Sequence, residues 1–216
     1  MTASTVHRIE PAGGRKARQL VVLLHGYGSC GADLIALGRA WSGVLPDAVF
    51  IAPDAPEPLP HESLVGRQWF ALSERDMREI ETGAEAAAPK LQALMDTALK
   101  HYGLDNRQLA VVGFSQGAAM AFQTTLRRHP APAALLAFSG MLPGPSKLDD
   151  IQTDTPVLIV HGDADDVVAP DFLTAAEAAL TRAGVTVDAH MLTGLDHSID
   201  ERVMVLGGRF LASAFA

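Results

Sequence analysis

Short runs of apolar residues recur along the chain, and segments with helical spacing separate them. The runs cover residues 20–24, 48–52, 109–112, 133–138, 157–160 and 185–192. Four of them are nearly continuous in apolar character, which is typical of strands that helices cover on both faces. The pattern predicts an α/β fold with a mostly parallel, doubly wound sheet.

Helical spacing of apolar residues is found in residues 32–42, 84–101, 118–128 and 171–183, and from Asp200 to the end. Asp200 is typical of an N-cap residue, because its carboxylate can accept hydrogen bonds from the first free N–H groups of a helix. Gly184 is typical of the residue after a helix, where left-handed backbone is common. Strands and helices alternate without an internal repeat, so we expect a single compact domain over residues 1–216.

Residues 53–73 interrupt this alternation. The segment is rich in proline, shows little periodicity and ends with the pair Trp69 and Phe70. A connection of this length in a compact domain is usually functional. Trp69 and Phe70 could form a wall of a substrate site or pack beneath the loop, and the sequence leaves both interpretations open.

Charge and composition exclude several classes of protein. Of 216 residues, 48% are hydrophobic, and 17 Lys and Arg stand against 25 Asp and Glu, for a net charge of −8. This chain lacks the basic field that gathers phosphate backbones, so we expect no nucleic acid partner. Scattered charges on an apolar-rich chain also exclude a disordered protein.

The single cysteine, Cys30, excludes an internal disulfide and a cysteine-rich metal site. The amino terminus has no apolar run of signal-peptide length, and no stretch approaches the roughly 20 apolar residues of a spanning helix. We therefore expect a cytoplasmic protein without stable membrane insertion.

The sharpest local motif is the pentapeptide from Gly113 to Gly117, with Ser115 at its centre. It stands between a predicted strand and a predicted helix and matches the G-x-S-x-G pattern of a nucleophile elbow. A sharp turn of this kind exposes the serine hydroxyl and points the helix N-terminus at it, which favours developing negative charge. We predict Ser115 as the nucleophile; an ordinary glycine-rich turn is the alternative.

A serine nucleophile needs a base within hydrogen-bond reach and a carboxylate that orients this base. In doubly wound hydrolases the order along the chain is serine, acid, histidine, which disfavours every histidine before Ser115. His129 lies roughly 20 Å away along the predicted helix. His161 comes too early to be third, and His190 lies within a predicted strand. His197, in the loop after the last predicted strand, is the expected base.

The acid is expected in the loop after residues 157–160. There Asp163, Asp165 and Asp166 occupy three of four consecutive positions. Spacing and chain order do not choose among them, and the two unused carboxylates would be solvated or would hydrogen-bond within the turn.

The oxyanion of a tetrahedral intermediate needs at least two donors. One is expected from the backbone N–H of Gln116, the residue after the nucleophile. The second is expected from Tyr27, in the glycine-rich loop after residues 20–24.

The same loop fits another function class. Residues 26–31 match the G-x-G-x-x-G dinucleotide fingerprint through Gly26, Gly28 and Gly31, and Asp54 could bind a ribose. A dinucleotide-binding oxidoreductase is therefore an alternative, although it leaves the motifs around residues 115 and 197 unused. A non-catalytic binding module on the hydrolase scaffold is a third interpretation. Cys30 is expected to be a small thiol packed in a turn.

With these residues placed, the sequence resembles the phospholipase/carboxylesterase family of small α/β-hydrolases, which includes acyl-protein thioesterases. The likeness spans about residues 19–198 and rests on LLHGYGS (23–29), GRQWF (66–70), GFSQGAAM (113–120), FSG (138–140), HGDADDVV (161–168) and DHS (196–198). The resemblance implies Ser115 as nucleophile, Asp165 as acid, His197 as base, and Tyr27 and Gln116 as oxyanion donors.

The resemblance also implies an activity. It suggests a serine carboxylesterase for esters of short to medium acyl chains, with thioesters and lysophospholipids as further substrate classes, and no metal or organic cofactor. It places Leu64, Trp69, Phe70 and Leu72 in the acyl pocket. The expected partner is the small-molecule ester or thioester substrate, and a homodimer stays open.

Overall fold

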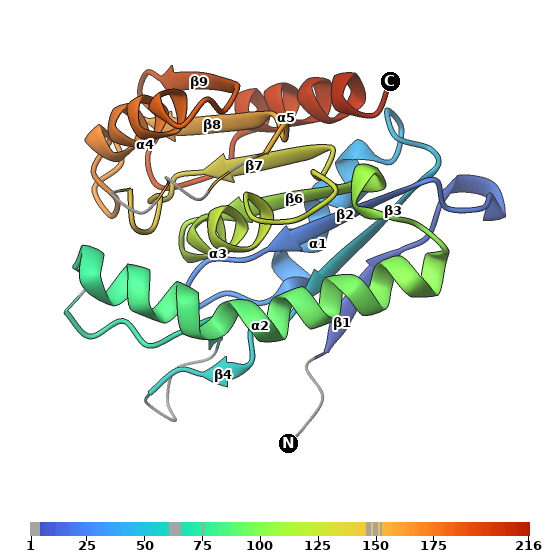
Figure 1. Ribbon diagram of the computed structural model, residues 1–216, viewed down its shortest axis with the longest axis horizontal. Coiled ribbons are helices and arrows are strands. Elements are labelled where there is room, and N and C mark those ends of the chain that lie inside the picture. The colour runs from blue at the N-terminus through green and yellow to red at the C-terminus, as the bar shows by residue number, and fades with distance from the viewer. Residues whose placement is uncertain (1–4, 61–65, 75, 146–147, 149–150, 152) are drawn as a thin grey trace.

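The chain folds into a seven-stranded sheet with helices on both faces (Figure 1). The structure is a computed structural model, and it describes residues 5–60, 66–74, 76–145, 148, 151 and 153–216. The strands are β1 (Val6–Ile9), β2 (Gln19–Leu24), β3 (Ala48–Pro53), β6 (Leu109–Phe114), β7 (Ala134–Phe138), β8 (Val157–Gly162) and β9 (Val187–Leu192). Their order is β1-β3-β2-β6-β7-β8-β9. All pair in parallel except β1, which pairs antiparallel with β3 at the edge.

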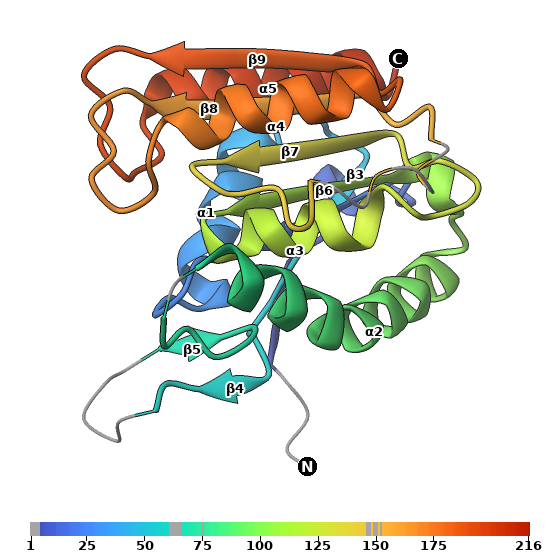
Figure 2. The same ribbon diagram turned by 60° about the vertical axis from the view of Figure 1, so that its left-hand side comes forward.

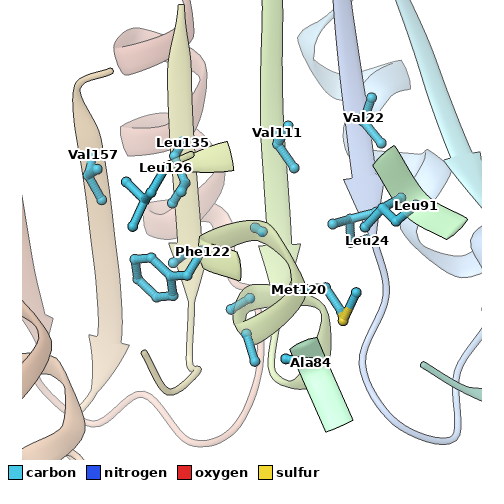
Figure 3. Close-up of a cluster of buried hydrophobic side chains, with 14 of the residues drawn as sticks. Val22, Leu24, Ala84, Leu91, Val111, Met120, Phe122, Leu126, Leu135 and Val157 are labelled. Atoms are coloured by element: carbon cyan, nitrogen blue, oxygen red, sulfur yellow. The ribbon is translucent and has the colours of Figure 1, made fainter. Parts of the chain in front are cut away.

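Helices cover both faces of this sheet, as the continuous apolar strands require. The helices α1 (Gly31–Trp41) and α5 (Glu201–Ala214) lie on one face, and α2 (Met77–Tyr102), α3 (Gln116–Thr125) and α4 (Asp171–Arg182) on the other (Figure 1). Figure 3 shows the core between the sheet and the second group, where Val22, Val111 and Leu135 from the strands face Met120 and Phe122 of α3. The predicted doubly wound α/β sheet is confirmed.

Short pieces outside the main sheet complete the fold. The pair β4 (Glu57–Pro58) and β5 (Arg67–Gln68) lies apart from it (Figure 2), and two 3₁₀ turns, η1 (Ala12–Gly14) and η2 (Asn106–Gln108), precede β2 and β6. Within the described ranges, none of the helices combines the length and the apolar character that crossing a bilayer requires.

The predicted helix ends hold with one large exception. The Asp200 side chain accepts a hydrogen bond from Val203 N–H at 3.1 Å and caps α5, and Gly184 has the expected positive φ of 80°. Helix α2 begins at Met77, two turns earlier than expected, because Asp76 caps it and accepts from Glu79 N–H at 2.7 Å. The first turns of α2 are mostly polar, so apolar spacing does not reveal them.

Candidate active site

The loops that follow β2, β6, β8 and β9 leave the sheet at its carboxyl edge, because these strands run in parallel (Figure 1). They carry Tyr27, Ser115, Asp165 and His197, respectively. Topology alone therefore brings residues from four distant parts of the sequence to one rim of the sheet.

Ser115 occupies a strained turn between β6 and α3. Its φ of 55° and ψ of −118° lie outside the regions that residues with side chains prefer. Its N–H donates to Phe138 O at 2.9 Å. The flanking glycines allow the turn to pack closely, since a Cβ on Gly113 would lie 2.1 Å from Gly117 O, and a Cβ on Gly117 would lie 2.0 Å from Leu24 O. The motif thus folds as the strand-to-helix elbow that the sequence predicts.

The Ser115 hydroxyl contacts the imidazole of His197, which in turn contacts the carboxylate of Asp165. Ser115 Oγ lies 3.0 Å from His197 Nε2, and His197 Nδ1 lies 2.8 Å from Asp165 Oδ2. An ionised carboxylate only accepts hydrogen bonds, so the imidazole proton lies on Nδ1, and Nε2 is free to accept the hydroxyl proton. The structure brings the three side chains into one hydrogen-bonded relay.

Asp165 is held in its ionised form. Its side chain has no exposed surface, and its Oδ1 accepts hydrogen bonds from Val167 N–H at 3.0 Å and Val168 N–H at 2.8 Å. Burial acts to raise the pKa of Asp165, but the hydrogen bonds from Val168, His197 and Val167 together outweigh it and lower the pKa below that of a free aspartate. The group therefore faces His197 as an anion at neutral pH.

The other two carboxylates of this loop point elsewhere. Asp163 accepts a hydrogen bond from Gly194 N–H at 2.6 Å, and Asp166 is exposed. Of the three candidates that the sequence left open, Asp165 is the one in contact with His197.

Tyr27 and Gln116 line the same cavity as Ser115, and each carries a backbone N–H group. Gln116 is the first residue of α3, where an N–H has no acceptor within the helix. Among the loop hydrogen bonds of the described chain, none uses Tyr27 N–H. Backbone N–H groups can stabilise the negative oxygen of a tetrahedral intermediate, and the roles of Tyr27 and Gln116 as oxyanion donors stay a prediction.

A buried histidine shapes the loop that carries Tyr27. His25 has no exposed surface; Ala55 N–H donates to its Nε2 at 2.9 Å, so its Nδ1–H donates to Gly26 O at 2.8 Å. Burial lowers the pKa of His25, which keeps the ring neutral. The loop approaches the nucleophile closely, because a Cβ on Gly26 would lie 3.2 Å from Ser115 Cβ.

The side chain of Gln116 ties the elbow to the segment after β5. Trp69 N–H donates to Gln116 Oε1 at 2.9 Å, and Gln116 Nε2 donates to Phe70 O at 2.7 Å. The Trp69 indole N–H in turn donates to His25 O at 2.9 Å. One amide therefore connects the loops after β5 and β6, and the indole extends this connection to the loop after β2.

A cavity of about 230 Å³ opens beside the relay. Its lining comprises Tyr27, Leu72, Ile80, Ser115, Gln116, Ala119, Gly140, Met141, Val167, Val168 and His197. Polar groups lie near Ser115 Oγ, whereas six lining residues are apolar. The sequence did not predict Ile80 and Met141 as lining residues. Only Met141 lies next to a recognised motif, because it directly follows FSG.

Of the four residues expected in the acyl pocket, the structure places one in the lining of the cavity. Leu72 lines the cavity, and Leu64 lies outside the described residues. The expectation that Trp69 and Phe70 form the pocket wall is corrected, because both side chains are about 95% buried and neither is among the residues that line the cavity. The Phe70 ring fills the space over Gly83 of α2, where a Cβ would lie 2.4 Å from the ring.

The glycine-rich loop after β2 is used differently from a dinucleotide site. Asp54 Oδ1 accepts a hydrogen bond from Gly31 N–H at 2.8 Å and so caps α1. Gly28 N–H donates to Arg67 O at 2.9 Å, which pairs the loop with β5. Cys30 is half-buried, with its Sγ 3.5 Å from Asp33 Oδ2. The described part of the chain contains no cluster of His, Cys, Asp and Glu suited to a metal ion.

Comparison with known proteins points to one family. The profile of the phospholipase/carboxylesterase family matches residues 6–214. The esterase YpfH of Escherichia coli (strain K12) is 27% identical over 198 residues, which cover 92% of this chain and 84% of YpfH. The crystal structure of esterase PE8 superposes with a TM-score of 0.92 at 39% identity, over 99% of this chain and 100% of PE8.

A plant protein shows the same likeness. The crystal structure of SOBER1 from Arabidopsis thaliana has a TM-score of 0.81 at 25% identity and covers 93% of this chain and 100% of that one. These matches confirm the α/β-hydrolase fold and set the oxidoreductase alternative aside. The chain therefore belongs to the phospholipase/carboxylesterase family, and it is a hydrolase that acts on esters.

Proposed function

We propose that the protein is a serine carboxylesterase that forms an acyl-enzyme on Ser115. The observation that carries this proposal is the relay from Ser115 Oγ to His197 Nε2 at 3.0 Å and from His197 Nδ1 to Asp165 Oδ2 at 2.8 Å. These distances satisfy the requirement for a nucleophile, a base and a carboxylate that orients the base.

In the first half-reaction, His197 Nε2 takes the Ser115 proton as Oγ attacks the ester carbonyl carbon. The carbonyl oxygen becomes negatively charged, and the N–H groups of Tyr27 and Gln116 stabilise it together with the N-terminus of α3. Asp165, ionised because its pKa is lowered, stabilises the imidazolium. His197 then gives its proton to the leaving alcohol, which departs as the acyl-enzyme forms.

Water completes the cycle by the reverse proton path. His197 takes a proton from a water molecule as the water oxygen attacks the acyl carbon. His197 then returns the proton to Ser115 Oγ when the carboxylic acid is released. All proton transfers use side chains that the chain itself supplies.

The cavity supports esters of short to medium acyl chains as substrates. Its apolar lining, which includes Leu72 and Met141, suits an alkyl chain, and its volume of about 230 Å³ limits that chain's length. Each methylene buried there contributes about 0.8 kcal/mol, or about fourfold in kcat/KM when the transition state buries it equally. The cavity does not distinguish the leaving group, so thioesters and lysophospholipids remain proposed substrate classes.

Covalent labelling tests the nucleophile. A fluorophosphonate probe should label the wild type and Ser198→Ala, but not Ser115→Ala. Ser198 is a matched control because its hydroxyl lies in the loop beside His197 and donates to Asp196. Hydrolysis of p-nitrophenyl butyrate should fall by about 10⁴-fold or more in Ser115→Ala and His197→Ala. Persistent labelling of Ser115→Ala would refute the assignment, and a wild type without turnover would favour a non-catalytic binding module.

A further inference from the structure

A second buried imidazole lies against the carboxylate of Asp165. His161, near the end of β8, has no exposed surface, and its Nε2 lies 2.9 Å from Val168 O and 3.1 Å from Asp165 Oδ2. Its Nδ1 is buried without a hydrogen-bond partner in the described structure. The ring takes no part in the relay derived above, so its placement needs another explanation.

The neighbours of Nε2 determine where the proton of this ring lies. A carbonyl oxygen and an ionised carboxylate only accept hydrogen bonds, so Nε2 must carry a proton. This N–H donates to Val168 O, and its positive end lies beside Asp165 Oδ2. Nδ1 has no hydrogen-bond partner, and a buried polar atom without a partner costs free energy. The contacts of Nε2–H are therefore the polar interactions by which this side chain can serve the site.

The His161 Nε2–H group affects both oxygens of Asp165, one through Val168 and the other directly. Val168 N–H donates to Asp165 Oδ1, while Val168 O accepts from His161, so the imidazole holds the residue whose N–H binds the carboxylate. Asp165 Oδ2 is the shared neighbour of His161 and His197. The other carboxylates of the loop turn away, since Asp163 bonds to Gly194 and Asp166 is exposed.

We infer that His161 is a positioning residue of the hydrolytic site. Its Nε2–H holds the turn from Asp165 to Val168 and withdraws negative charge from Asp165 Oδ2, which moderates how strongly that oxygen stabilises the His197 imidazolium. This inference rests on the proposed roles of Ser115, Asp165 and His197. It assigns to the HGDADDVV segment a second group that acts on the reaction through the carboxylate.

A matched pair of variants tests this role in the full-length protein. His161→Gln retains an N–H donor near the position of Nε2, whereas His161→Met has a similar length and no donor. With p-nitrophenyl butyrate, we expect kcat of His161→Met to fall about tenfold, with KM changed less than twofold. The acid limb of its kcat/KM profile should move to higher pH by about half a unit, because Asp165 then stabilises the imidazolium more strongly. His161→Gln should restore both quantities to near wild-type values.

Two outcomes would overturn the inference. One is a wild-type kcat and acid limb in His161→Met; the other is identical defects in His161→Met and His161→Gln, since a packing role needs no donor. If His161→Met does not fold, as judged by near-UV circular dichroism, His161→Phe replaces it as the variant without a donor. Failure of the proposed function is recognised separately, because then either Ser115→Ala retains turnover or the wild type has none, whatever residue stands at 161.

Discussion

The substitution Gln116→Met tests the side-chain hydrogen bonds of Gln116 without removing its backbone N–H. The side chain is almost fully buried, and its amide bonds Trp69 N–H at 2.9 Å and Phe70 O at 2.7 Å. Methionine has a similar length and can form neither bond. The variant therefore leaves one buried donor and one buried acceptor without partners, while the proposed oxyanion donor stays in place.

The magnitude follows from these two groups. Each buried polar group without a partner costs about 1–3 kcal/mol, so after local relaxation we expect a loss of about 2–3 kcal/mol in the free energy of unfolding. In a domain of this size, 1 kcal/mol shifts Tm by about 2–4 °C, so Tm should fall by about 4–12 °C. Thermal unfolding followed by far-UV circular dichroism measures this shift. A Tm within 1 °C of the wild type would refute the assignment of these bonds.

The variant Gln116→Glu provides a pH-dependent control. Its protonated carboxyl can accept from Trp69 N–H and donate to Phe70 O, as the amide does, whereas its ionised form would repel Phe70 O. The fold therefore raises the pKa of this carboxyl above its unfolded value of about 4.3. The protonated carboxyl of this variant stabilises the folded state; this contribution is fully present below the unfolded pKa and is lost as pH rises through the folded pKa. The Tm deficit relative to wild type should grow between pH 4 and pH 7, and a constant deficit would contradict the predicted geometry.

Three further predictions concern other parts of the molecule. The lowered pKa of Asp165 means that its ionised form stabilises the fold above the unfolded pKa of about 3.9, and that this stabilisation is lost as pH falls through the folded pKa. The gap in unfolding free energy between wild type and Asp165→Asn, measured by urea titration, should therefore narrow from pH 6 to pH 3; a constant gap would contradict it. Asp200→Ala should lose about 1 kcal/mol by removing the cap of α5, whereas Glu201→Ala should lose much less, and equal losses would argue against the cap. Leu72→Ala should lengthen the acyl cavity and raise kcat/KM for p-nitrophenyl octanoate relative to butyrate, by about fourfold for each additional buried methylene; an unchanged ratio would place the acyl chain elsewhere.

The central strands could be predicted from the sequence because both of their faces are buried. The apolar runs locate the central strands β2, β3, β6, β7 and β8 to within two residues at each end. A further run locates the edge strand β9 equally well, although none of its residues is fully buried. The edge strand β1 escaped prediction, since its four residues include His7 and Arg8 and only one of its sides is paired. An apolar pattern records burial, so it finds the centre of a sheet more readily than its edge.

The residues of the site likewise differ in how well the sequence predicts them. The elbow around Ser115 and the loop position of His197 are local features, and chain order is sufficient to propose them. The orientation of Trp69 is not local, because its indole N–H bonds to His25 O, 44 positions earlier. An aromatic residue in a loop suits a pocket wall or a core equally well, and partners distant in the sequence decide which it becomes.

The dipeptide His-Gly occurs twice at the carboxyl edge of the sheet, directly after β2 and at the end of β8, and has the same structural use in both places. After β2, the His25 ring bonds backbone groups and Gly26 approaches Ser115; at the end of β8, the His161 ring bonds Val168 O in the loop that follows. A Cβ on Gly162 would lie 2.0 Å from Leu195 O, so this glycine lets the loop that carries His197 lie against the loop that carries Asp165. In each case a buried imidazole fixes its own loop, and the following glycine admits the neighbouring one. The relay geometry therefore depends on buried side-chain bonds to backbone as well as on the three side chains of the relay.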